Sequence, residues 1–477
     1  MASAKKYDCV IIGSGQGGTP LAGAFAKAGQ KTALIERSHI GGCCVNEGCT
    51  PTKTMIASGR VAYLTRRRAD YGVHTPEDNN KGRILVDMKK VRQRKRDIVD
   101  IWRGGGEART RSAGVDVLMG DARFDDPKTL TIKLNDGSEM TVSADKIFIN
   151  AGERPAKPKL EGVDTIPADL ILDSTSIQEV GEVPQQLIIL GGGYVGLEFG
   201  QLFRRLGSNV TIIQRGPQLL PREDPDIAEE MLKILREDGI MVHLSTVATH
   251  VSSPSAGTIS LTISSSSDSH PQTVIGTHLL SAAGRVPNTD TLNLSVAGVE
   301  VSPRGYVVTN PQLETNVPHI YAMGDVKGPP AFTHISYDDF RILRDNLIDR
   351  KSSLHTVSHR MIPYVVYTDP QLGHVGVHEG EVRKLFPDRQ IKVAKMPMAY
   401  VARAVETDEP RGLMKAIVDA DSGLILGFTC LGLEGGEIMS IMQTAMMGGL
   451  RYERLQDAIW AHPTLAESLN NLWGYLE

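Results

Sequence analysis

The chain has 477 residues, of which 41% are hydrophobic and 23% charged, and its net charge is −4. This length predicts about three domains at roughly 150 residues each, each able to bury its own core. The slightly acidic net charge argues against nucleic acids and anionic membranes as partners. The sequence contains no long run of uncharged apolar residues, so we expect no membrane span. Five cysteines in so long a chain are not a disulfide scaffold, so we expect a reducing compartment, the cytoplasm.

Two segments that lie 178 residues apart carry one pattern. Residues 7–18, YDCVIIGSGQGG, predict a buried strand and a glycine-rich turn, followed by a small-residue helix and a second strand at 30–37. Residues 187–215 repeat this order. Strand, G-x-G-x-x-G, helix and strand predict a dinucleotide-binding unit whose helix N-terminus faces the phosphates. The glycines in register are Gly13, Gly15, Gly18 and Gly29 in the first copy and Gly191, Gly193, Gly196 and Gly207 in the second.

The position that ends the second strand differs between the copies. In the first copy it is Glu36, whose carboxylate suits the ribose hydroxyls of an adenosine with a free 2′-OH. In the second copy it is Gln214, followed by Arg215 and then by Arg222. Loss of the acid removes repulsion toward a 2′-phosphate, and arginine binds phosphate in a forked geometry. The second site therefore favours NADPH, although Arg37 at the matching first-copy position allows Arg215 to be an ordinary surface residue.

Two cysteines, Cys44 and Cys49, follow the first copy. Pro51 suits the first turn of a helix, so Cys49 is expected at a helix N-terminus, where the dipole lowers a thiol pKa. Lys53 adds positive charge on the same helix face. The pair is either a redox dithiol or two buried, inert cysteines. Its spacing is not a zinc signature, and we expect no structural metal site.

A Lys/Arg-rich stretch at residues 89–111 is interrupted by acidic residues and contains one aromatic residue, Trp102. Nucleic-acid surfaces usually interleave basic and aromatic side chains. The stretch therefore predicts a solvated helix after the dithiol helix, with a nucleic-acid patch as the alternative.

Further motifs make the chain similar to the class I flavoprotein disulfide reductases, the family of dihydrolipoamide dehydrogenase, glutathione reductase and mercuric reductase. The resemblance covers almost the whole chain. Beside the two glycine-rich units, it rests on GGCCVNEGCTPTK at 41–53, IFINAGERP at 147–155, GGGYVGLE at 191–198, AAGRVPN at 282–288, AMGDV at 322–326, YVVYTDPQLGHVG at 364–376 and AHPTLAESLNNL at 461–472.

The resemblance implies an α/β fold with two Rossmann-like dinucleotide-binding domains, for FAD and NAD(P), and a C-terminal α+β dimerisation domain. The expected limits are 1–154 and 284–354 for the FAD domain, 155–283 for the NAD(P) domain and 355–477 for the interface domain. It also implies a twofold homodimer with a composite active site.

The resemblance further implies that NADPH reduces a Cys44–Cys49 disulfide through FAD. Cys49 would be the thiol next to the flavin, and Cys44 the exposed interchange thiol. Lys53 would pair with Glu198 near the flavin, because buried charges are costly when unpaired. Tyr194 resembles the aromatic residue that covers the nicotinamide face of the flavin when no nicotinamide is bound.

His462 resembles the base that exchanges a proton with the interchange thiol of the partner subunit. Glu467 would orient its ring. Two simpler readings stay open. Thr464 and Glu467 have the spacing of a capping box, so the acid closes a helix start in one reading, and His462 is an ordinary loop residue in the other.

The cofactor-binding residues are carried over by the same resemblance. Asp325 would bind the flavin ribityl chain, although an aspartate there could also cap a turn. For FAD the residues are Gly13, Gly15, Gly18, Glu36, Lys53, Ala122, Gly152, Asp325 and Thr333. For NADPH they are Gly191, Gly193, Tyr194, Gly196, Arg215, Arg222 and Gly284.

The electron acceptor is the least determined feature of the sequence. The runs at 50–73 and 332–347 look most similar to mercuric-reductase-like proteins. The leading interpretation is therefore reduction of Hg(II), a soft ion that Cys44 and Cys49 would ligate transiently. The vicinal C-terminal cysteines of well-studied mercuric reductases are missing, as is their N-terminal C-x-x-C domain. Cys43 replaces the usual threonine before the first cysteine and either adds a soft ligand or has no role.

Two other functions are compatible with the sequence. The alternative is a reductase of a small-molecule disulfide, such as lipoamide or glutathione. Lipoamide enzymes normally use NAD, so Gln214 and Arg215 count mildly against lipoamide. The third is a redox-inactive flavoprotein used for binding, which the presence of both cysteines and His462 disfavours.

Overall fold

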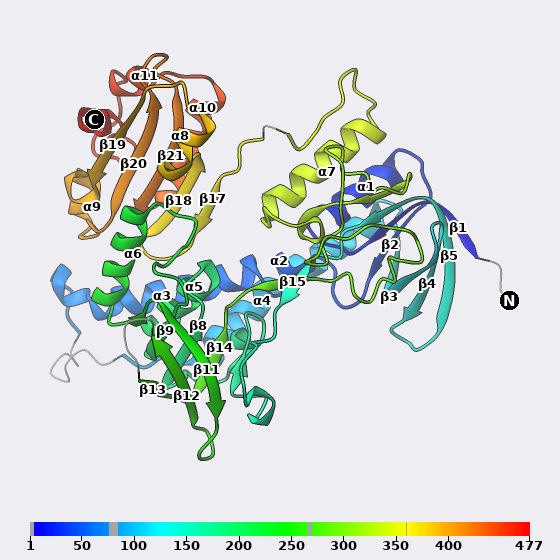
Figure 1. The fold of residues 1–477 in the computed structure, drawn as a ribbon, viewed down its shortest axis with the longest axis horizontal. Helices are drawn as coiled ribbons and strands as arrows, with labels where there is room; N and C mark the ends of the chain where they lie inside the picture. The colour runs from blue at the N-terminus through cyan, green and yellow to red at the C-terminus, as the bar shows by residue number, and fades with distance from the viewer. Residues whose placement is uncertain (1–3, 76–83, 266–269, 359) are drawn as a thin grey trace. The chain divides into compact units, whose positions relative to one another are not determined.

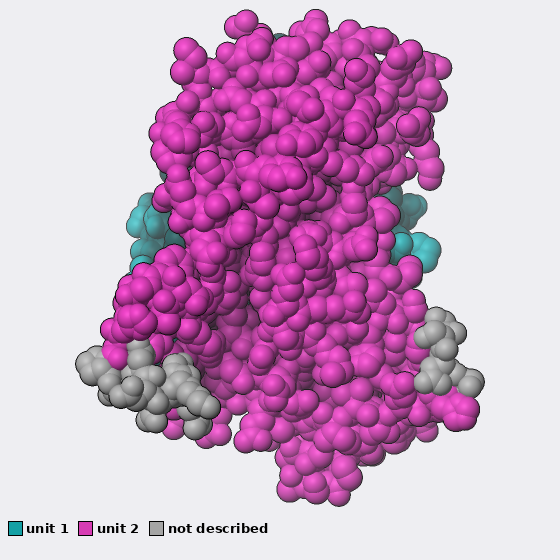
Figure 2. Space-filling view, turned by 90° about the vertical axis from the view of Figure 1, so that its left-hand side faces the viewer, with its two compact units in different colours: residues 1–54, 90–156, 284–360 teal, residues 55–89, 157–283, 361–477 magenta. Residues whose placement is uncertain are grey.

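The computed structural model describes residues 4–75, 84–265, 270–358 and 360–477 (Figure 1). The chain separates into two compact units, each built from three segments and coloured separately in Figure 2. The first unit is Met1–Thr54, Lys90–Ala156 and Gly284–Arg360, and the second is Met55–Lys89, Lys157–Ala283 and Met361–Glu477. The three-domain limits expected from the sequence stay predictions. None of the described helices has the length and apolar character that a bilayer crossing requires.

The first unit is built on a six-stranded sheet in the order β1-β2-β3-β4-β5-β16, in which β1 also pairs with β5. The strands β1, β2, β5 and β16 run parallel, and β3, β4 and β5 form an antiparallel meander. Helices α1 and α7 pack on each other, and α1 lies against β1 and β2 (Figure 1). The bounds are β1 (Lys5–Ile12), α1 (Gly18–Lys27), β2 (Thr32–Glu36), β3 (Asp116–Asp126), β4 (Thr129–Leu134), β5 (Glu139–Ile149), β16 (Ile320–Ala322) and α7 (Thr333–Leu347).

The glycines of both copies are required by close packing at the turn between strand and helix. Gly13 has φ +100°, and a Cβ on Gly18 would lie 2.2 Å from the Gly13 carbonyl oxygen. In the second copy Gly191 has φ +111°, and a Cβ on Gly196 would lie 2.1 Å from the Gly191 carbonyl oxygen. The first glycine makes the turn, and the third lets the helix approach the strand. Both predicted units are therefore present.

Three helices and a two-stranded antiparallel sheet complete the segments around the dithiol. They are α2 (Gly42–Asn46), α3 (Cys49–Arg66), α4 (Met88–Ser112), β6 (Glu153–Pro155) and β15 (Arg285–Pro287). Helix α4 contains the basic stretch, and most of its basic side chains are exposed, although Lys95 is buried. The predicted solvated helix is therefore confirmed.

The second unit contains a five-stranded parallel sheet in the order β10-β9-β8-β14-β7. Its strands are short, buried apolar runs, as expected for a sheet covered on both faces. An antiparallel meander, β11-β12-β13, belongs to the same unit. The bounds are β7 (Ile171–Leu172), β8 (Gln186–Leu190), α5 (Tyr194–Leu206), β9 (Asn209–Ile213), α6 (Pro225–Glu237), β10 (Met241–His243), β11 (Thr246–Ser252), β12 (Ile259–Ser265), β13 (Gln272–Gly276) and β14 (His278–Ser281).

The C-terminal part of the second unit is an antiparallel sheet in the order β17-β18-β21-β20-β19, and α10 packs on β18 and β21 (Figure 1). A separate hydrophobic core lies between this sheet and the helices around it. The bounds are β17 (Tyr364–Val366), β18 (Gln371–Gly376), α8 (Glu379–Leu385), β19 (Ile391–Pro397), α9 (Ala402–Glu406), β20 (Leu413–Asp419), β21 (Ile425–Gly432), α10 (Gly435–Met447), α11 (Tyr452–Gln456) and α12 (Ser468–Asn471). The predicted α/β fold with an α+β C-terminal domain is confirmed.

Candidate active site

In both copies a side chain at the end of the second strand accepts a hydrogen bond from a backbone N–H of the glycine-rich turn. The Glu36 carboxylate accepts hydrogen bonds from the Ser14 N–H at 3.1 Å and from the Ser14 hydroxyl at 2.6 Å. The Gln214 amide oxygen accepts one from the N–H of Gly192, the equivalent of Ser14, at 3.1 Å. The Gln214 NH2 group donates to the Gln218 carbonyl at 3.0 Å. The copies therefore share a turn contact and differ in charge.

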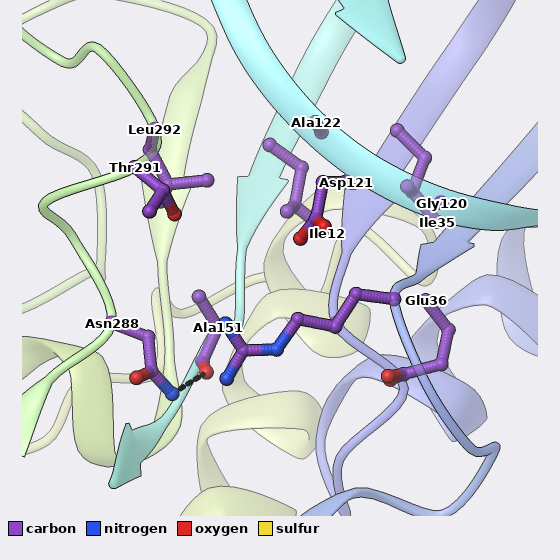
Figure 3. A pocket seen from close by; sticks show the side chains of 12 residues that line it. Ile12, Ile35, Glu36, Gly120, Asp121, Ala122, Ala151, Asn288, Thr291 and Leu292 are labelled. Atoms are coloured by element: carbon purple, nitrogen blue, oxygen red, sulfur yellow. Dashed lines mark hydrogen bonds between the residues drawn. The ribbon is translucent and has the colours of Figure 1, made fainter. Parts of the chain in front are cut away.

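A pocket lies at the carboxyl ends of the parallel strands β1 and β2, the place where dinucleotides bind in such sheets (Figure 3). Three predicted FAD residues, Gly13, Glu36 and Ala122, line it. Asn288 lies across the pocket from Glu36; its side-chain amide donates to the Ala151 carbonyl at 2.9 Å. The other lining residues are Ile12, Ile35, Arg37, Gly120, Asp121, Ala151, Thr291 and Leu292. A carboxylate beside a partly apolar pocket fits the adenosine end of FAD.

Asp325 lies in the short 3-10 helix Gly324–Lys327 of the first unit. Burial raises the pKa of Asp325 to about 6, with a further contribution from Glu153, while Arg285 and Lys327 act in the opposite direction. A carboxylate this far removed from water needs hydrogen-bond donors. The hydroxyl groups of a ribityl chain would supply them, so this residue also fits FAD. Gly152 immediately precedes Glu153, and the Gly152 carbonyl accepts a hydrogen bond from the Asn288 N–H at 3.0 Å.

Cys44 and Cys49 are in contact. Cys44 lies in α2, and Cys49 is the first residue of α3. The pKa of the Cys44 thiol is raised, first by its hydrogen bond to Cys49 and then by burial. Thr333, the first residue of α7, places its hydroxyl 3.3 Å from the Cys49 sulfur. The N-termini of α3 and α7 therefore meet at Cys49, where their dipoles favour a thiolate on that sulfur, while Cys44 is the protonated partner that hydrogen-bonds to it.

Cys43 has a partner that sequence reasoning missed. Arg285 places Nη2 3.6 Å from the Cys43 sulfur, and its Nε lies 3.4 Å from Oε2 of Glu153. The Tyr306 hydroxyl donates to the other oxygen of Glu153 at 2.6 Å. Burial raises the pKa of Cys43 to about 11, although Arg285 lowers it. Cys43 is therefore a thiol at neutral pH, held beside the dithiol by a residue far away in sequence.

His462 and Glu467 are brought together as predicted. His462 Nδ1 lies 2.9 Å and 3.0 Å from the two oxygens of Glu467. The Glu467 backbone N–H donates to the Thr464 hydroxyl at 3.2 Å, just before α12. The Glu467 carboxylate thus contacts the His462 ring, while the Thr464 hydroxyl closes the turn that precedes α12; α12 itself has no side-chain cap, so the structure does not show the capping box. The His462 side chain is 67% exposed. Its role toward a dithiol stays a prediction.

The predicted Lys53–Glu198 pair joins residues of different units and stays a prediction. Lys53 lies in the first turns of α3. Glu198 is buried in α5, where one carboxylate oxygen accepts the Tyr367 N–H at 2.8 Å.

The predicted NADPH residues gather around the start of α5, with one exception. Gly193 is the N-cap of α5 and Tyr194 is its first residue. Arg215 and Arg222 are exposed on the loop between β9 and α6. Gly284 belongs to the first unit, so its place at this site stays a prediction.

Sequence reasoning also gave no role to two groups of buried polar side chains. The Asn150 amide, at the end of β5, donates to the Gly13 carbonyl at 3.0 Å and so fixes the first turn. A second group surrounds Tyr364 in the C-terminal sheet. Asn150, Tyr364 and His374 lie inside motifs that carry the family resemblance, IFINAGERP and YVVYTDPQLGHVG, which is the signal that could have drawn attention to them; Glu223 and His378 lie outside these motifs.

Comparison with known proteins agrees with this geometry. The profile described as "Pyridine nucleotide-disulphide oxidoreductase" matches residues 7–339, and the profile for the dimerisation domain of the same family matches residues 362–472. The chain is 36% identical over 475 residues to the probable pyridine nucleotide-disulfide oxidoreductase RclA of Escherichia coli, covering 99% of this chain and 100% of that protein.

Other relatives carry different names. A dihydrolipoyl dehydrogenase of Thermus scotoductus is 32% identical, with 98% of this chain and 96% of that protein covered. A mercuric reductase of Lysinibacillus sphaericus is 30% identical, with 97% and 81% covered.

The fold is also that of a solved structure. A Cu(II) complex of the HOCl-induced flavoprotein disulfide reductase RclA from Escherichia coli superposes with a TM-score of 0.87 at 34% identity, covering 98% of this chain and 99% of that chain. The two profiles together cover most of the sequence, and RclA is matched along its whole length. These matches establish the family. The chain belongs to the pyridine nucleotide-disulphide oxidoreductase family of FAD-containing flavoproteins.

Proposed function

We propose that the chain is an NADPH-dependent flavoprotein that reduces a small-molecule disulfide through the Cys44–Cys49 couple. The observation that carries this proposal is the contact between the two thiols at the N-termini of α3 and α7. The couple lies in the same unit as the pocket lined by Glu36. Bound FAD would supply two-electron transfer from a nicotinamide to sulfur.

The dithiol performs the acceptor half of the reaction by thiol exchange. The Cys44 thiolate attacks one sulfur of the substrate disulfide, which forms a mixed disulfide and releases the first thiol. Cys49 then attacks the Cys44 sulfur, which releases the second thiol and leaves a Cys44–Cys49 disulfide. Two electrons from NADPH restore the dithiol, and the two substrate sulfurs each gain one proton.

We propose that His462 carries out the proton transfers to and from the thiols in this exchange. Its exposed ring is held by Glu467 through Nδ1, which leaves Nε2 for exchange with a thiol. The match to a dimerisation domain supports a homodimer. In that dimer His462 of the partner subunit would serve Cys44, giving the composite site expected from the sequence.

The preference for NADPH is proposed from the second copy. Gln214 brings no negative charge to the strand end, and its amide is occupied by the turn and by Gln218. Arg215 and Arg222 are exposed and able to meet a 2′-phosphate. A reducing compartment, the cytoplasm, suits a chain whose five cysteines are all free thiols.

The remaining cofactor assignments belong to the same proposal. Thr333 and Lys53 would lie at the flavin end of FAD, and Asp325 at its ribityl chain. The turn glycines Gly15 and Gly18 would admit its pyrophosphate at the N-terminus of α1, and Gly191, Gly193 and Gly196 would do the same for NADPH at α5.

Reduction of Hg(II), the leading expectation from the sequence, becomes the second candidate. Mercuric reductases match at 30% and 32% identity, no better than the dihydrolipoyl dehydrogenases at 31% and 32%, and below RclA at 36%. A soft metal ion as acceptor keeps support from one observation, the Cu(II) complex of RclA. Thiolates suit both kinds of acceptor, so the dithiol alone does not distinguish them.

The test is a comparison of acceptors with the holoenzyme and NADPH. Oxidation of NADPH is followed with oxidised glutathione, lipoamide, Hg(II) with excess thiol, and Cu(II). The proposal expects the highest kcat/KM with one of the disulfides. Production of volatile mercury, or turnover with metal ions alone, would replace it by the second candidate.

A further inference from the structure

A buried group of polar side chains in the second unit packs against Tyr194. The proposed reaction does not use this group. We call Glu223, Tyr364, His374 and His378 the Tyr364 cluster. With Tyr194 the rings form one continuous stack. The centroids are 5.7 Å apart for Tyr194 and Tyr364, 5.0 Å for Tyr364 and His374, and 3.8 Å for His374 and His378. The first residue of α5 therefore rests on rings supplied by the C-terminal sheet.

The C-terminal sheet explains why these rings meet. Tyr364 in β17 lies directly opposite His374 in β18, and His374 lies opposite Thr429 in β21. Residues opposite each other on one sheet face have neighbouring side chains. His374 Nδ1 lies 2.8 Å from the Thr429 hydroxyl, and burial lowers the pKa of His374 to about 3. His374 is thus a neutral, fixed ring that supports Tyr364.

The Tyr364 hydroxyl is the centre of the hydrogen bonds. It lies 2.6 Å from Glu223 Oε1 and 3.2 Å from His378 Nε2, and it is hydrogen-bonded to Tyr194. A phenol has one donor and two acceptor positions. Donation to Glu223 leaves both acceptor positions for the His378 Nε2–H and the Tyr194 hydroxyl. In this assignment His378 Nδ1 is an unprotonated acceptor, and among the described residues neither it nor Glu223 Oε2 has a hydrogen-bond partner.

Glu223 connects this arrangement to the second nucleotide site. It closes the loop that begins at Gln214, and its carbonyl accepts from the Gln218 side chain at 3.0 Å. In the same loop the Leu220 N–H donates to the Gly192 carbonyl at 2.9 Å, which ties the loop to the glycine-rich turn. Glu223 is only 4% exposed, so its carboxylate is a fixed acceptor for Tyr364.

We infer that Tyr364 is a positioning residue for Tyr194: held by Glu223 and His378, it fixes the Tyr194 ring in a resting place and thereby lowers the apparent affinity for NADPH. The inference rests on the proposed function and on the role that the family resemblance gives Tyr194, which covers the nicotinamide face of the flavin and so has to move when NADPH binds. Affinity falls in proportion to the fraction of molecules that are competent to bind. A single hydrogen bond that favours the resting state is expected to change that affinity about three- to tenfold.

A metal site is the competing explanation of the cluster. Glu223, His374 and His378 place possible ligand atoms within 4.8 Å of one another, the one such group found among the described residues. However, the two imidazole planes are 10° from parallel at 3.8 Å, and an imidazole lone pair lies in its ring plane. One ion cannot lie in both planes. His374 Nε2 is also 3.2 Å from the Gly376 carbonyl, which suits an N–H donor rather than a ligand.

Elemental analysis separates these explanations. The purified holoenzyme, supplied with one equivalent of Zn(II) and then desalted, is expected to retain no zinc that depends on the cluster. Stoichiometric zinc that disappears in His378→Asn would assign the cluster to a metal and overturn the inference.

The positioning role is tested by a double-mutant cycle in the holoenzyme. Tyr194→Phe and Tyr364→Phe each remove one hydroxyl of the Tyr194–Tyr364 hydrogen bond and keep the ring. Tyr194→Phe leaves the buried Tyr364–Glu223 pair intact, so it serves even if Tyr364→Phe folds poorly. Tyr400→Phe, whose ring is 60% exposed, is the matched control.

We expect each single variant to lower both the NADP⁺ dissociation constant, measured by calorimetry, and KM for NADPH, while kcat changes less. The double variant should gain no more than either single. Independent, additive effects, or shifts no larger than in Tyr400→Phe, would overturn the inference. Failure of NADPH to reduce the parent flavin would instead overturn the proposed function, and the NADP⁺ dissociation constants would still decide the role of Tyr364.

Discussion

The two copies of the nucleotide-binding unit use one structural contact, but the acceptor is negatively charged in the first copy and neutral in the second. Glu36 and Gln214 stand at equivalent strand ends and accept the N–H of equivalent turn residues at the same distance, 3.1 Å. The turn therefore does not depend on the charge of the acceptor. A carboxylate and a carboxamide have nearly the same shape, so the site can change its preferred nucleotide without changing its fold.

The copies diverge further after their second strands. At the constant displacement of 178 residues, Cys44 corresponds to Arg222, and Val45 corresponds to Glu223. The segment that carries the dithiol in one copy thus carries an exposed cation and a buried acid in the other. The two copies therefore retain the nucleotide-binding unit and differ in the segment that follows it.

The largest expected effect is on turnover, and it comes from removing a cysteine of the dithiol segment in the first copy. Cys44→Ala should lower disulfide turnover at least about a thousandfold, because no thiolate is left to attack the substrate. NADPH should still reduce the flavin, measured by rapid-mixing absorbance. Cys43→Ser is the matched control and should retain turnover. Normal turnover of Cys44→Ala would exclude the dithiol route.

Gln214→Glu gives the second copy the acid of the first. Its carboxylate would repel a 2′-phosphate, so kcat/KM for NADPH should fall about ten- to a hundredfold, while kcat/KM for NADH holds or rises. Steady-state kinetics with both nucleotides measure this. Gln272→Glu adds the same charge at an exposed strand position and should leave the ratio unchanged. An unaltered preference in Gln214→Glu would contradict the account of this position.

Glu36→Gln makes the reverse exchange. The turn contact with Ser14 should persist, as Gln214 demonstrates, but the charged acceptor for ribose hydroxyls is lost. Loss of charge-assisted hydrogen bonds should raise the dissociation constant of FAD about tenfold. Titration of the apoprotein with FAD, followed by fluorescence, gives the value. Glu139→Gln on exposed β5 surface is the control, and equal affinity in both variants would argue against Glu36 as a ligand.

The last expected effect is on stability rather than on nucleotide binding or turnover, and it concerns Glu223, whose first-copy counterpart is the buried Val45. Burial raises the pKa of Glu223 from its ordinary value of 4.5 to about 7. A raised carboxyl pKa means that folding favours the protonated form, so its contribution to stability is complete below about pH 4.5 and is lost as pH rises to about 7. Glu223→Gln lacks this loss, so its stability relative to the parent should increase by up to about 3 kcal/mol between pH 5 and pH 8. Urea unfolding at several pH values measures the difference, and a pH-independent difference would mean that Glu223 titrates normally.

The features that were predictable from the sequence are those encoded by neighbours in the chain. The glycine spacing, the apolar strands and the start of α3 at Cys49 are all local patterns, and the structure contains them. His462 and Glu467 are five residues apart and also meet as expected.

Contacts between distant residues were not predictable in this way. Cys43 meets Arg285 across 242 residues, and Asn150 meets Gly13 across 137. Tyr364 meets Glu223 across 141 residues. The hydrophobic periodicity of the sequence does not predict which distant loop contacts a given buried hydroxyl. The acceptor was not determined for a different reason: a disulfide and a soft metal ion require the same thiolate, so one dithiol is compatible with both.

The central claim is that electrons from NADPH reach the Cys44–Cys49 couple through bound FAD. Anaerobic titration with NADPH, recorded as absorbance spectra of the parent and of Cys49→Ser, tests it most directly. We expect a long-wavelength thiolate–flavin absorption band in the parent and none in Cys49→Ser. A band that persists in the variant would show that Cys49 is not the thiol beside the flavin.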